Sequence, residues 1–101
     1  MKTYTMCGSM RFEKEMMETA FLLETQNHFN ILQCIYTDKE LTEEEKSKLA
    51  KAHYRKIDLS DGVYVLNING YIGSSVAEEI RYAVQNGKEI LYHCPVIGEK
   101  L

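Results

Sequence analysis

The sequence predicts an α/β fold of three layers (α/β/α), in which helices cover both faces of a parallel sheet. Two observations support this prediction. Short β-prone runs alternate with helix-like runs in the order β-α-β-α-β-α-β, and residues 63–66 form the continuous apolar run that is typical of a buried parallel strand. With right-handed crossovers, we expect the strand order 2-1-3-4 of a flavodoxin-like sheet within the Rossmann class. A chain of 101 residues has room for one modest core, so we expect a single domain over residues 1–101.

The four strands are expected in runs that are rich in β-branched and aromatic residues. Residues 3–7 are β-prone and end at a Gly-Ser pair, which favours a strand. Residues 29–36 predict a second strand, whose polar members indicate partial exposure at an edge of the sheet. Residues 63–66 and 89–94 predict the third and fourth strands, and residues 95–98 begin a short tail.

The three helices are expected between these strands. Residues 13–26 place apolar side chains on one face at helical spacing. Thr42 and Glu45 fit the Thr-x-x-Glu pattern of a capping box, which opens a helix that extends to about residue 57. Its acidic residues come first and its basic residues last, as the helix dipole favours. A third helix is expected over residues 75–86, before a glycine that is a natural stop.

Composition limits the classes of partner. The net charge is −3 and the lysines are interleaved with acids, which argues against binding to a nucleic acid polymer. No apolar run is long enough to span a bilayer or to form a signal peptide, so we expect no membrane partner. The three cysteines lie far apart in or beside apolar runs, without metal-ligand spacing. We therefore expect reduced core cysteines, no metal, no cofactor and a cytoplasmic location.

The strand order predicts where a ligand binds. The topological switch lies between the first and third strands, so a ligand is expected where their carboxyl ends diverge. The loop after the first strand contains Gly8 and Ser9, which offer backbone amides and a hydroxyl, and Arg11, which could hold a phosphate. The alternative is that this loop is a plain turn with a surface arginine.

The loop after the third strand offers a second set of polar groups. Asn67 and Asn69 could bind hydroxyls of a ligand, or they could be there because asparagine adopts backbone dihedrals that most residues disfavour. Tyr71 is the best placed ring for stacking on a base. Serines at the next helix start could bind an anion. The candidate ligand-binding residues of both loops are Cys7, Gly8, Ser9, Arg11, Asn67, Asn69, Tyr71, Gly73, Ser74 and Ser75.

Two adjacent glutamates on the third helix have different expected roles. Ser75 and Glu78 fit a second capping box, which predicts a structural role for Glu78. Glu79 lies on the edge of the apolar stripe, where its carboxylate is expected to be partly desolvated and available for chemistry. The alternative is that Glu79 reaches out to a cation at the surface.

His53 shares one stripe of the second helix with Leu49 and Ile57, at helical spacing, and so is expected to point inward. Two interpretations remain open for it. It is either a core histidine bonded to a backbone carbonyl or a catalytic residue.

Three blocks of sequence, in this order, resemble the nucleoside 2-deoxyribosyltransferase family. Residues 4–11 read Tyr-Thr-Met-Cys-Gly-Ser-Met-Arg and resemble the opening strand and Cys-Gly-Ser-x-Arg loop. Residues 60–66 read Ser-Asp-Gly-Val-Tyr-Val-Leu and resemble a second strand. Residues 79–88 resemble the helix with the family glutamate, followed by Gly-Lys. The motifs are most similar to those of the 2′-deoxynucleoside 5′-phosphate N-hydrolases and of small phage and bacterial proteins with this core.

The resemblance implies retaining cleavage of the N-glycosidic bond of a (deoxy)nucleoside 5′-monophosphate, by hydrolysis or by transfer. Glu79 matches the family's nucleophile, which would attack the anomeric carbon and form a glycosyl-enzyme ester. Ser9 and Arg11, with Ser74 or Ser75, would hold the 5′-phosphate. The resemblance also implies a homodimer or larger homo-oligomer in which neighbouring subunits complete the site.

One position departs from the family pattern. The family has an aspartate eight residues before the aspartate of its second block, and counting back from Asp61 gives His53. A histidine there could bond the nucleophile or deliver a proton to the leaving base. Two functions therefore stay open: the enzyme, and a non-catalytic module that binds a nucleotide or a nucleotide-derived signal.

Overall fold

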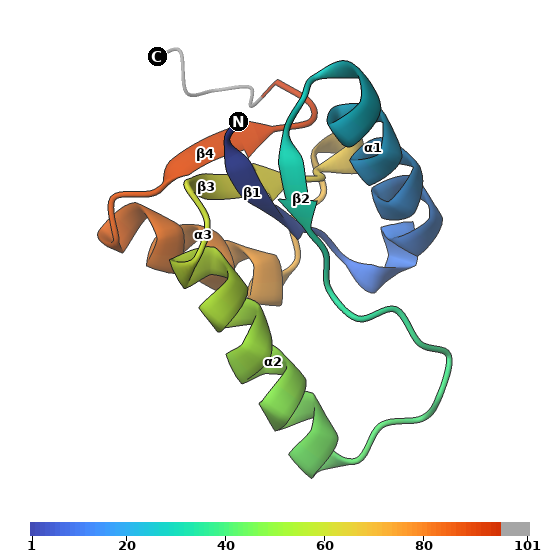
Figure 1. The fold of residues 1–101 in the computed structure, drawn as a ribbon. Coiled ribbons are helices and arrows are strands. Elements are labelled where there is room, and N and C mark those ends of the chain that lie inside the picture. Colours follow the sequence, from blue (N-terminus) through green and yellow to red (C-terminus); the bar gives the residue numbers. More distant parts are fainter. Residues whose placement is uncertain (96–101) are drawn as a thin grey trace.

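The computed structural model describes residues 1–95, which form a parallel four-stranded sheet between layers of helices (Figure 1). The strand order is β2-β1-β3-β4, so the predicted fold class and strand order are confirmed. The strands are β1 (Thr3–Cys7), β2 (Asn30–Leu32), β3 (Gly62–Val65) and β4 (Glu89–Tyr92). The helices are α1 (Glu13–Gln26), α2 (Glu43–Asp58) and α3 (Ser74–Gln85), with 3₁₀ turns η1 (Met10–Phe12) and η2 (Ile68–Gly70).

The sheet separates two hydrophobic cores. Successive side chains of a strand point to opposite faces, and in β1 Met6 packs in the core under α1 whereas Cys7 packs in the core under α2 and α3. Figure 1 shows α1 alone on one face and the other two helices on the opposite face. The first core is built from Tyr4, Met6, Met16, Ala20, Leu23, Ile31 and Leu66. The second is built from Cys7, Ile57, Val63, Val65, Val76 and Ala83.

Polar contacts join the strands at their amino-terminal ends. The Asp61 carboxylate accepts a 2.8 Å hydrogen bond from the backbone N–H of Thr3. The Glu89 carboxylate accepts hydrogen bonds from the hydroxyl of Tyr4 (2.8 Å) and from Lys2 (3.1 Å). Gly62 must be a glycine, because a Cβ there would lie 2.2 Å from the carbonyl oxygen of Glu89. Side chains of the protein therefore fill the amino-terminal end of the sheet, and the carboxyl end is left for a ligand.

The second strand is shorter than predicted. A strand was expected over residues 29–36, but β2 pairs with β1 only from Asn30 to Leu32. Directly after it, the Lys56 ammonium of α2 donates a hydrogen bond to the carbonyl of Gln33, so this carbonyl has a partner outside the sheet. Residues 33–42 then form a long connection without regular structure before α2.

The last strand also ends early, at Tyr92 instead of residue 94. Cys94 instead bonds the side chain of Asn67. The backbone N–H of Cys94 donates to the Asn67 side chain at 2.8 Å, and the Asn67 side chain donates to the backbone carbonyl of Cys94 at 3.0 Å. Of the expected tail, residues 96–98 lie outside the described residues.

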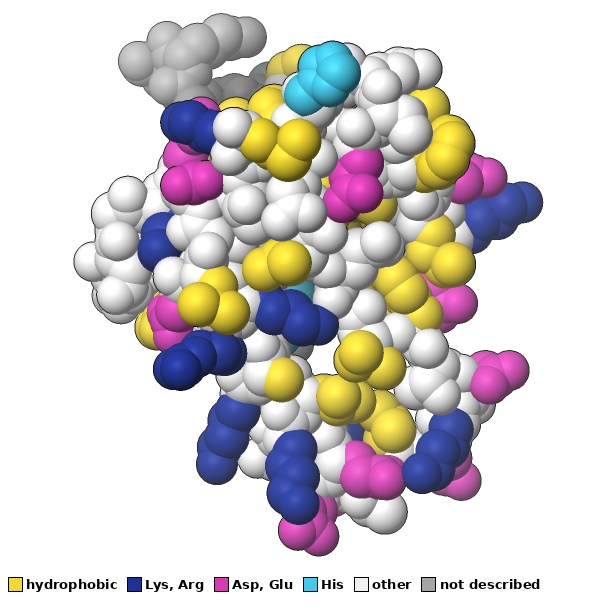
Figure 2. All heavy atoms as spheres, viewed as in Figure 1, with side chains coloured by type: hydrophobic (Ala, Val, Ile, Leu, Met, Phe, Trp, Pro, Cys, Tyr) yellow, Lys and Arg dark blue, Asp and Glu magenta, His cyan; other side chains and the backbone are white. Residues whose placement is uncertain are grey.

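The exposed surface carries mixed charges. Figure 2 shows Lys and Arg side chains interspersed with Asp and Glu over the visible face. Within residues 1–95, no helix combines the length and apolar character needed to cross a bilayer.

Candidate functional site

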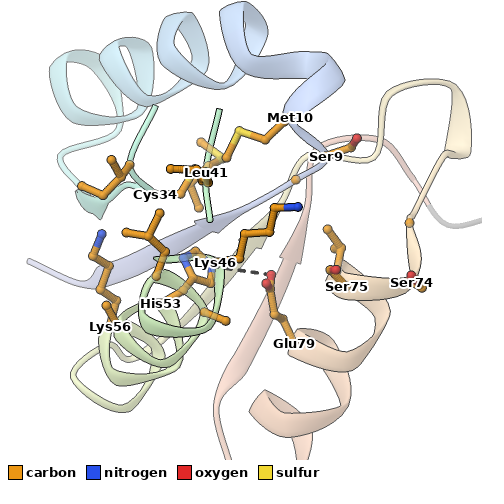
Figure 3. Close-up of a pocket in the computed structure, with 18 of the residues that line it drawn as sticks. Ser9, Met10, Cys34, Leu41, Lys46, His53, Lys56, Ser74, Ser75 and Glu79 are labelled. Atoms are coloured by element: carbon orange, nitrogen blue, oxygen red, sulfur yellow. Dashed lines mark ion pairs between the residues drawn. The ribbon is translucent and has the colours of Figure 1, made fainter. Parts of the chain in front are cut away.

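A pocket of about 530 Å³ lies at the carboxyl ends of β1 and β3 (Figure 3). Its walls come from the loop after β1, the start of α3, the inward face of α2, and the connection over residues 34–41. This is the position at which the strand order predicts a ligand site, because the loops after β1 and β3 diverge there.

The two sides of the pocket differ in polarity. Ser74 and Ser75 lie where α3 begins, and Ser9 lines the pocket from the loop after β1 (Figure 3). The side near α2 is lined by Ile35 and Leu41. Figure 2 shows apolar side chains gathered between α2 and the connection that precedes it. The pocket thus offers hydroxyls on the side of α3 and, on the side of α2, apolar side chains together with Lys46 and Lys56.

Glu79 and His53 meet at the base of this pocket. Glu79 projects from α3 and His53 from α2, and Oε1 of the carboxylate lies 3.5 Å from Nε2 of the imidazole. Their side chains are 16% and 11% exposed, which makes both of them largely desolvated. The prediction that His53 points inward is confirmed, because it is one of only two buried residues of α2. Glu79 faces the pocket and not a surface cation.

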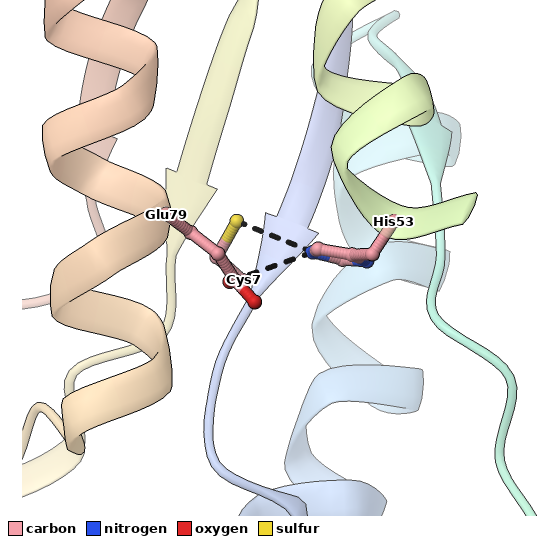
Figure 4. Close-up of side chains that lie close together, drawn as sticks. All are labelled: Cys7, His53 and Glu79. Carbon is pink, nitrogen blue, oxygen red and sulfur yellow. Dashed lines mark hydrogen bonds and ion pairs between the residues drawn. The ribbon is translucent and has the colours of Figure 1, made fainter. Parts of the chain in front are cut away.

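Cys7, at the end of β1, completes a cluster with these two residues (Figure 4). Its Sγ lies 3.6 Å from the same Nε2 of His53. Burial and the charge of Glu79 raise the pKa of the Cys7 thiol well above its ordinary value. A thiol held in its neutral form and fully buried is not prepared to act as a nucleophile.

The other ring nitrogen of His53 is buried, and among residues 1–95 it has no hydrogen-bond partner. The interpretation of His53 as a core histidine bonded to a backbone carbonyl is therefore wrong. In a Cys-His-Glu triad the acid orients the histidine through the ring nitrogen that does not face the nucleophile. Here Cys7 and Glu79 share one nitrogen, so the cluster is not such a triad.

The start of α3 differs from the prediction. The helix begins at Ser74, one residue earlier than expected, with Gly73 as the N-cap, and no side chain in the described part of the chain caps it. Ser75 therefore lies inside the first turn, where it cannot act as an N-cap. Glu78 forms a 2.7 Å ion pair with Arg81 instead of closing a capping box. That second capping box was a wrong prediction, and the first amides of α3 are left open beside the pocket.

The remaining predicted residues lie at different distances from the pocket. Gly8 and Tyr71 line it, and a Cβ on Gly8 would lie 2.8 Å from the sulfur of Met16. Arg11 lies at the rim, where its guanidinium stacks 4.0 Å from the Tyr71 ring centre and donates to the Tyr71 hydroxyl at 3.3 Å.

Four predicted residues are not among those that line the pocket, namely Cys7, Arg11, Asn67 and Asn69, and the last two have other roles. The Asn67 side chain is buried and both of its polar atoms bond Cys94. Asn69 is exposed in η2. Its φ of 55° is a left-handed backbone conformation that asparagine adopts more readily than most residues. Their predicted roles in binding ligand hydroxyls therefore have no support in the geometry.

Two lysines of α2 also line the pocket and were not predicted, namely Lys46 and Lys56. They lie seven residues before and three after His53, which are positions on the same helical face. That spacing is the signal by which they could have been found. Lys46 pairs with Glu43 at 3.2 Å, so it lies at the outer margin of the site.

No protein-family model matches the chain, and comparisons with curated proteins and with solved structures find no match. Functional inference therefore depends on the pocket and its residues.

Proposed function

We propose that the protein is a nucleotide N-glycosidase or 2-deoxyribosyltransferase that acts on a (deoxy)nucleoside 5′-monophosphate through Glu79. The observation that carries this proposal is the desolvated Glu79–His53 pair, in one pocket with the uncapped start of α3. A carboxylate for the sugar and an anion-binding helix start for the phosphate are the two features that this chemistry needs.

The proposed reaction has two steps. Glu79 attacks the anomeric carbon, the bond to the base breaks, and the base leaves with a proton while an ester forms between sugar and carboxylate. Water or a second base then attacks the anomeric carbon, and the Glu79 carboxylate is released. His53, with Nε2 3.5 Å from Glu79, orients the nucleophile or delivers the proton to the leaving base.

The substrate is oriented by the two sides of the pocket. Its phosphate lies against Ser74 and Ser75, where the helix dipole and the open amides favour an anion. Ser9 lines the same pocket. The base lies toward the apolar side near Leu41. A volume of about 530 Å³ is in the range of small-molecule sites.

The adjacent glutamates provide a matched test. We expect the wild-type protein to release free base from a panel of deoxynucleoside monophosphates, as followed by chromatography. Glu79→Gln should slow release by at least about a thousand-fold, the order of loss seen when a covalent nucleophile is removed. Glu78→Gln, which changes an exposed residue one position away, should leave release unchanged. Release that survives in Glu79→Gln would overturn the mechanism.

The second candidate function is a binding module without catalysis. The observation that favours it is His53 itself, which stands where the resembling family has an aspartate. In that case the wild-type protein releases no base from the panel, and nucleotides raise the melting temperature of the wild type and of Glu79→Gln equally.

The proposal includes a cytoplasmic homodimer or larger homo-oligomer. All three cysteines are free, in keeping with a reducing compartment. Of the sixteen residues of α2, His53 and Ile57 are the ones that are buried, which leaves much of this helix for a neighbouring subunit. Light scattering after gel filtration measures the number of subunits.

A further inference from the structure

Cys7 forms a compact cluster with His53 and Glu79, the two residues that meet at the base of the pocket. Sγ, Nε2 and a carboxylate oxygen all lie within 4.8 Å of one another (Figure 4). We propose that this cluster binds a thiophilic divalent cation, for which Zn²⁺ is the best match. The three residues come from β1, α2 and α3, so no spacing in the sequence could indicate the site.

Two of the three separations between donor atoms are those of a tetrahedral zinc site, and the third, between Cys7 and Glu79, is at most 4.8 Å. With Zn–S near 2.3 Å and Zn–N near 2.0 to 2.1 Å, a tetrahedral ion holds its sulfur and nitrogen ligands about 3.6 Å apart. The separation between Cys7 and His53 is 3.6 Å. A nitrogen and an oxygen ligand should lie about 3.4 Å apart, and His53 and Glu79 are separated by 3.5 Å.

The charges also suit a divalent cation. A thiolate from Cys7 and the carboxylate of Glu79 balance the two positive charges, so the filled site is neutral within a buried cluster. His53 contributes a neutral imidazole nitrogen. Cys7 is a thiol in the metal-free protein, so binding releases its proton to solvent.

An ion can reach this site through the pocket, and once bound it keeps one open coordination position. His53 and Glu79 line the pocket, so the pocket is the path of access. Three protein ligands leave a fourth position for water or an anion, as in catalytic zinc sites. This inference does not depend on the proposed function. A bound ion would, however, occupy the Glu79 carboxylate, so metal binding and nucleophilic attack by Glu79 exclude each other.

The surroundings of His53 set the expected affinity. A metal-ligating histidine ordinarily donates its other N–H to an oxygen, and loss of that partner weakens binding by roughly 10- to 100-fold. Nδ1 of His53 is buried without a partner among the residues that the structure describes. We therefore expect a site weaker than a structural zinc site by that factor.

Cobalt titration of the chelator-treated protein of residues 1–101, without nucleotide, tests the site directly. Co²⁺ bound in this cluster should give tetrahedral d–d bands and a thiolate-to-cobalt charge-transfer band, both of which Zn²⁺ displaces. Cys7→Ser should lose the charge-transfer band. Glu79→Gln and His53→Gln should bind Zn²⁺ at least about ten-fold more weakly in competition with a chromophoric indicator.

The other cysteines supply the controls. Cys34→Ser and Cys94→Ser should keep the charge-transfer band, and Cys34 is the sharper control because it lines the same pocket. A band that survives in Cys7→Ser, or that disappears in Cys34→Ser, would overturn the proposal, as would the absence of any band in the wild type. Circular dichroism verifies that each variant is folded. The test is also separate from base release: a cobalt band without base release removes the proposed function and keeps the metal site.

Discussion

The starts of α2 and α3 share a sequence pattern and differ in structure. Both read Ser/Thr-x-x-Glu, the signature of a capping box. At α2 the box forms: Glu45 N–H donates to the Thr42 hydroxyl and Thr42 N–H donates to the Glu45 carboxylate, both at 3.0 Å. At α3 it does not form, because Gly73 takes the N-cap position and Ser75 is already inside the helix.

The difference shows what the pattern specifies and what it leaves open. A hydroxyl caps a helix only if it stands immediately before the first helical residue, and a shift of one residue removes that geometry. The start of α2 faces solvent and its donors are bound by its own chain. The start of α3 faces the pocket, and within the described residues no acidic side chain occupies its first turn. The same pattern therefore gives a capped helix start in one place and an uncapped helix start beside the pocket in the other.

Of the substitutions that distinguish the two helix starts, Ser75→Asp is expected to have the largest effect, and this effect is on ligand affinity. A carboxylate in the first turn of α3 would occupy the proposed phosphate position and repel the proposed substrate, so affinity for deoxynucleoside monophosphates should fall at least about a hundred-fold. The same charge suits the helix dipole, so the melting temperature should stay the same or rise. Isothermal titration calorimetry measures the affinity, with Ser75→Asn as the uncharged control. Equal affinity for Ser75→Asp and the wild type would show that the phosphate binds elsewhere.

A smaller effect is expected when the hydroxyls are removed. Thr42→Ala should lower the free energy of unfolding by about 1 kcal/mol, because it removes an N-cap. Ser75→Ala should change that free energy by less than about 0.5 kcal/mol, since this hydroxyl caps nothing. Urea denaturation measures both values. Equal losses in the two variants would contradict the assignment of Gly73 as the N-cap.

The smallest effect is expected in the pH dependence of stability. Hydrogen bonds from the Thr42 backbone and from Lys39 lower the pKa of Glu45 below its ordinary value. A lowered pKa in the folded state gives stability that is present above the unfolded pKa, near 4.5, and is lost as pH falls through the folded pKa. Glu45→Gln should therefore flatten the acid side of the stability profile measured by urea denaturation. An acid side as steep in Glu45→Gln as in the wild type would contradict this prediction.

Much of the fold could be predicted from local patterns. Alternating strand and helix signals predict a parallel sheet and its order, because crossover geometry leaves few alternatives. The early end of β2 could not be predicted, since the bond that follows it, from Lys56 of α2 to the backbone of Gln33, joins distant parts of the chain. The bond between Asn67 and Cys94 likewise joins the ends of two strands and leaves no local signal.

The candidate site could be predicted in part. Helical spacing places His53 inward and Glu79 on a partly apolar face, and the strand order brings both toward one edge of the sheet. Their separation of 3.5 Å, and the approach of Cys7 to the same nitrogen, depend on how α2 and α3 pack against the sheet. The apolar wall over residues 34–41 has no regular structure and hence no periodic pattern to reveal it.

The long connection over residues 33–42 has a consequence for how the protein can be divided. A cut there separates β1, α1 and β2 from all the later elements, although β1 pairs in register with β3, from Tyr4 opposite Gly62 to Cys7 opposite Val65. Each fragment would expose one side of a central strand and half of the core. The two fragments should therefore remain unfolded alone and reassemble when mixed, which makes this protein a natural candidate for a split reporter whose halves recombine through a single parallel strand pair.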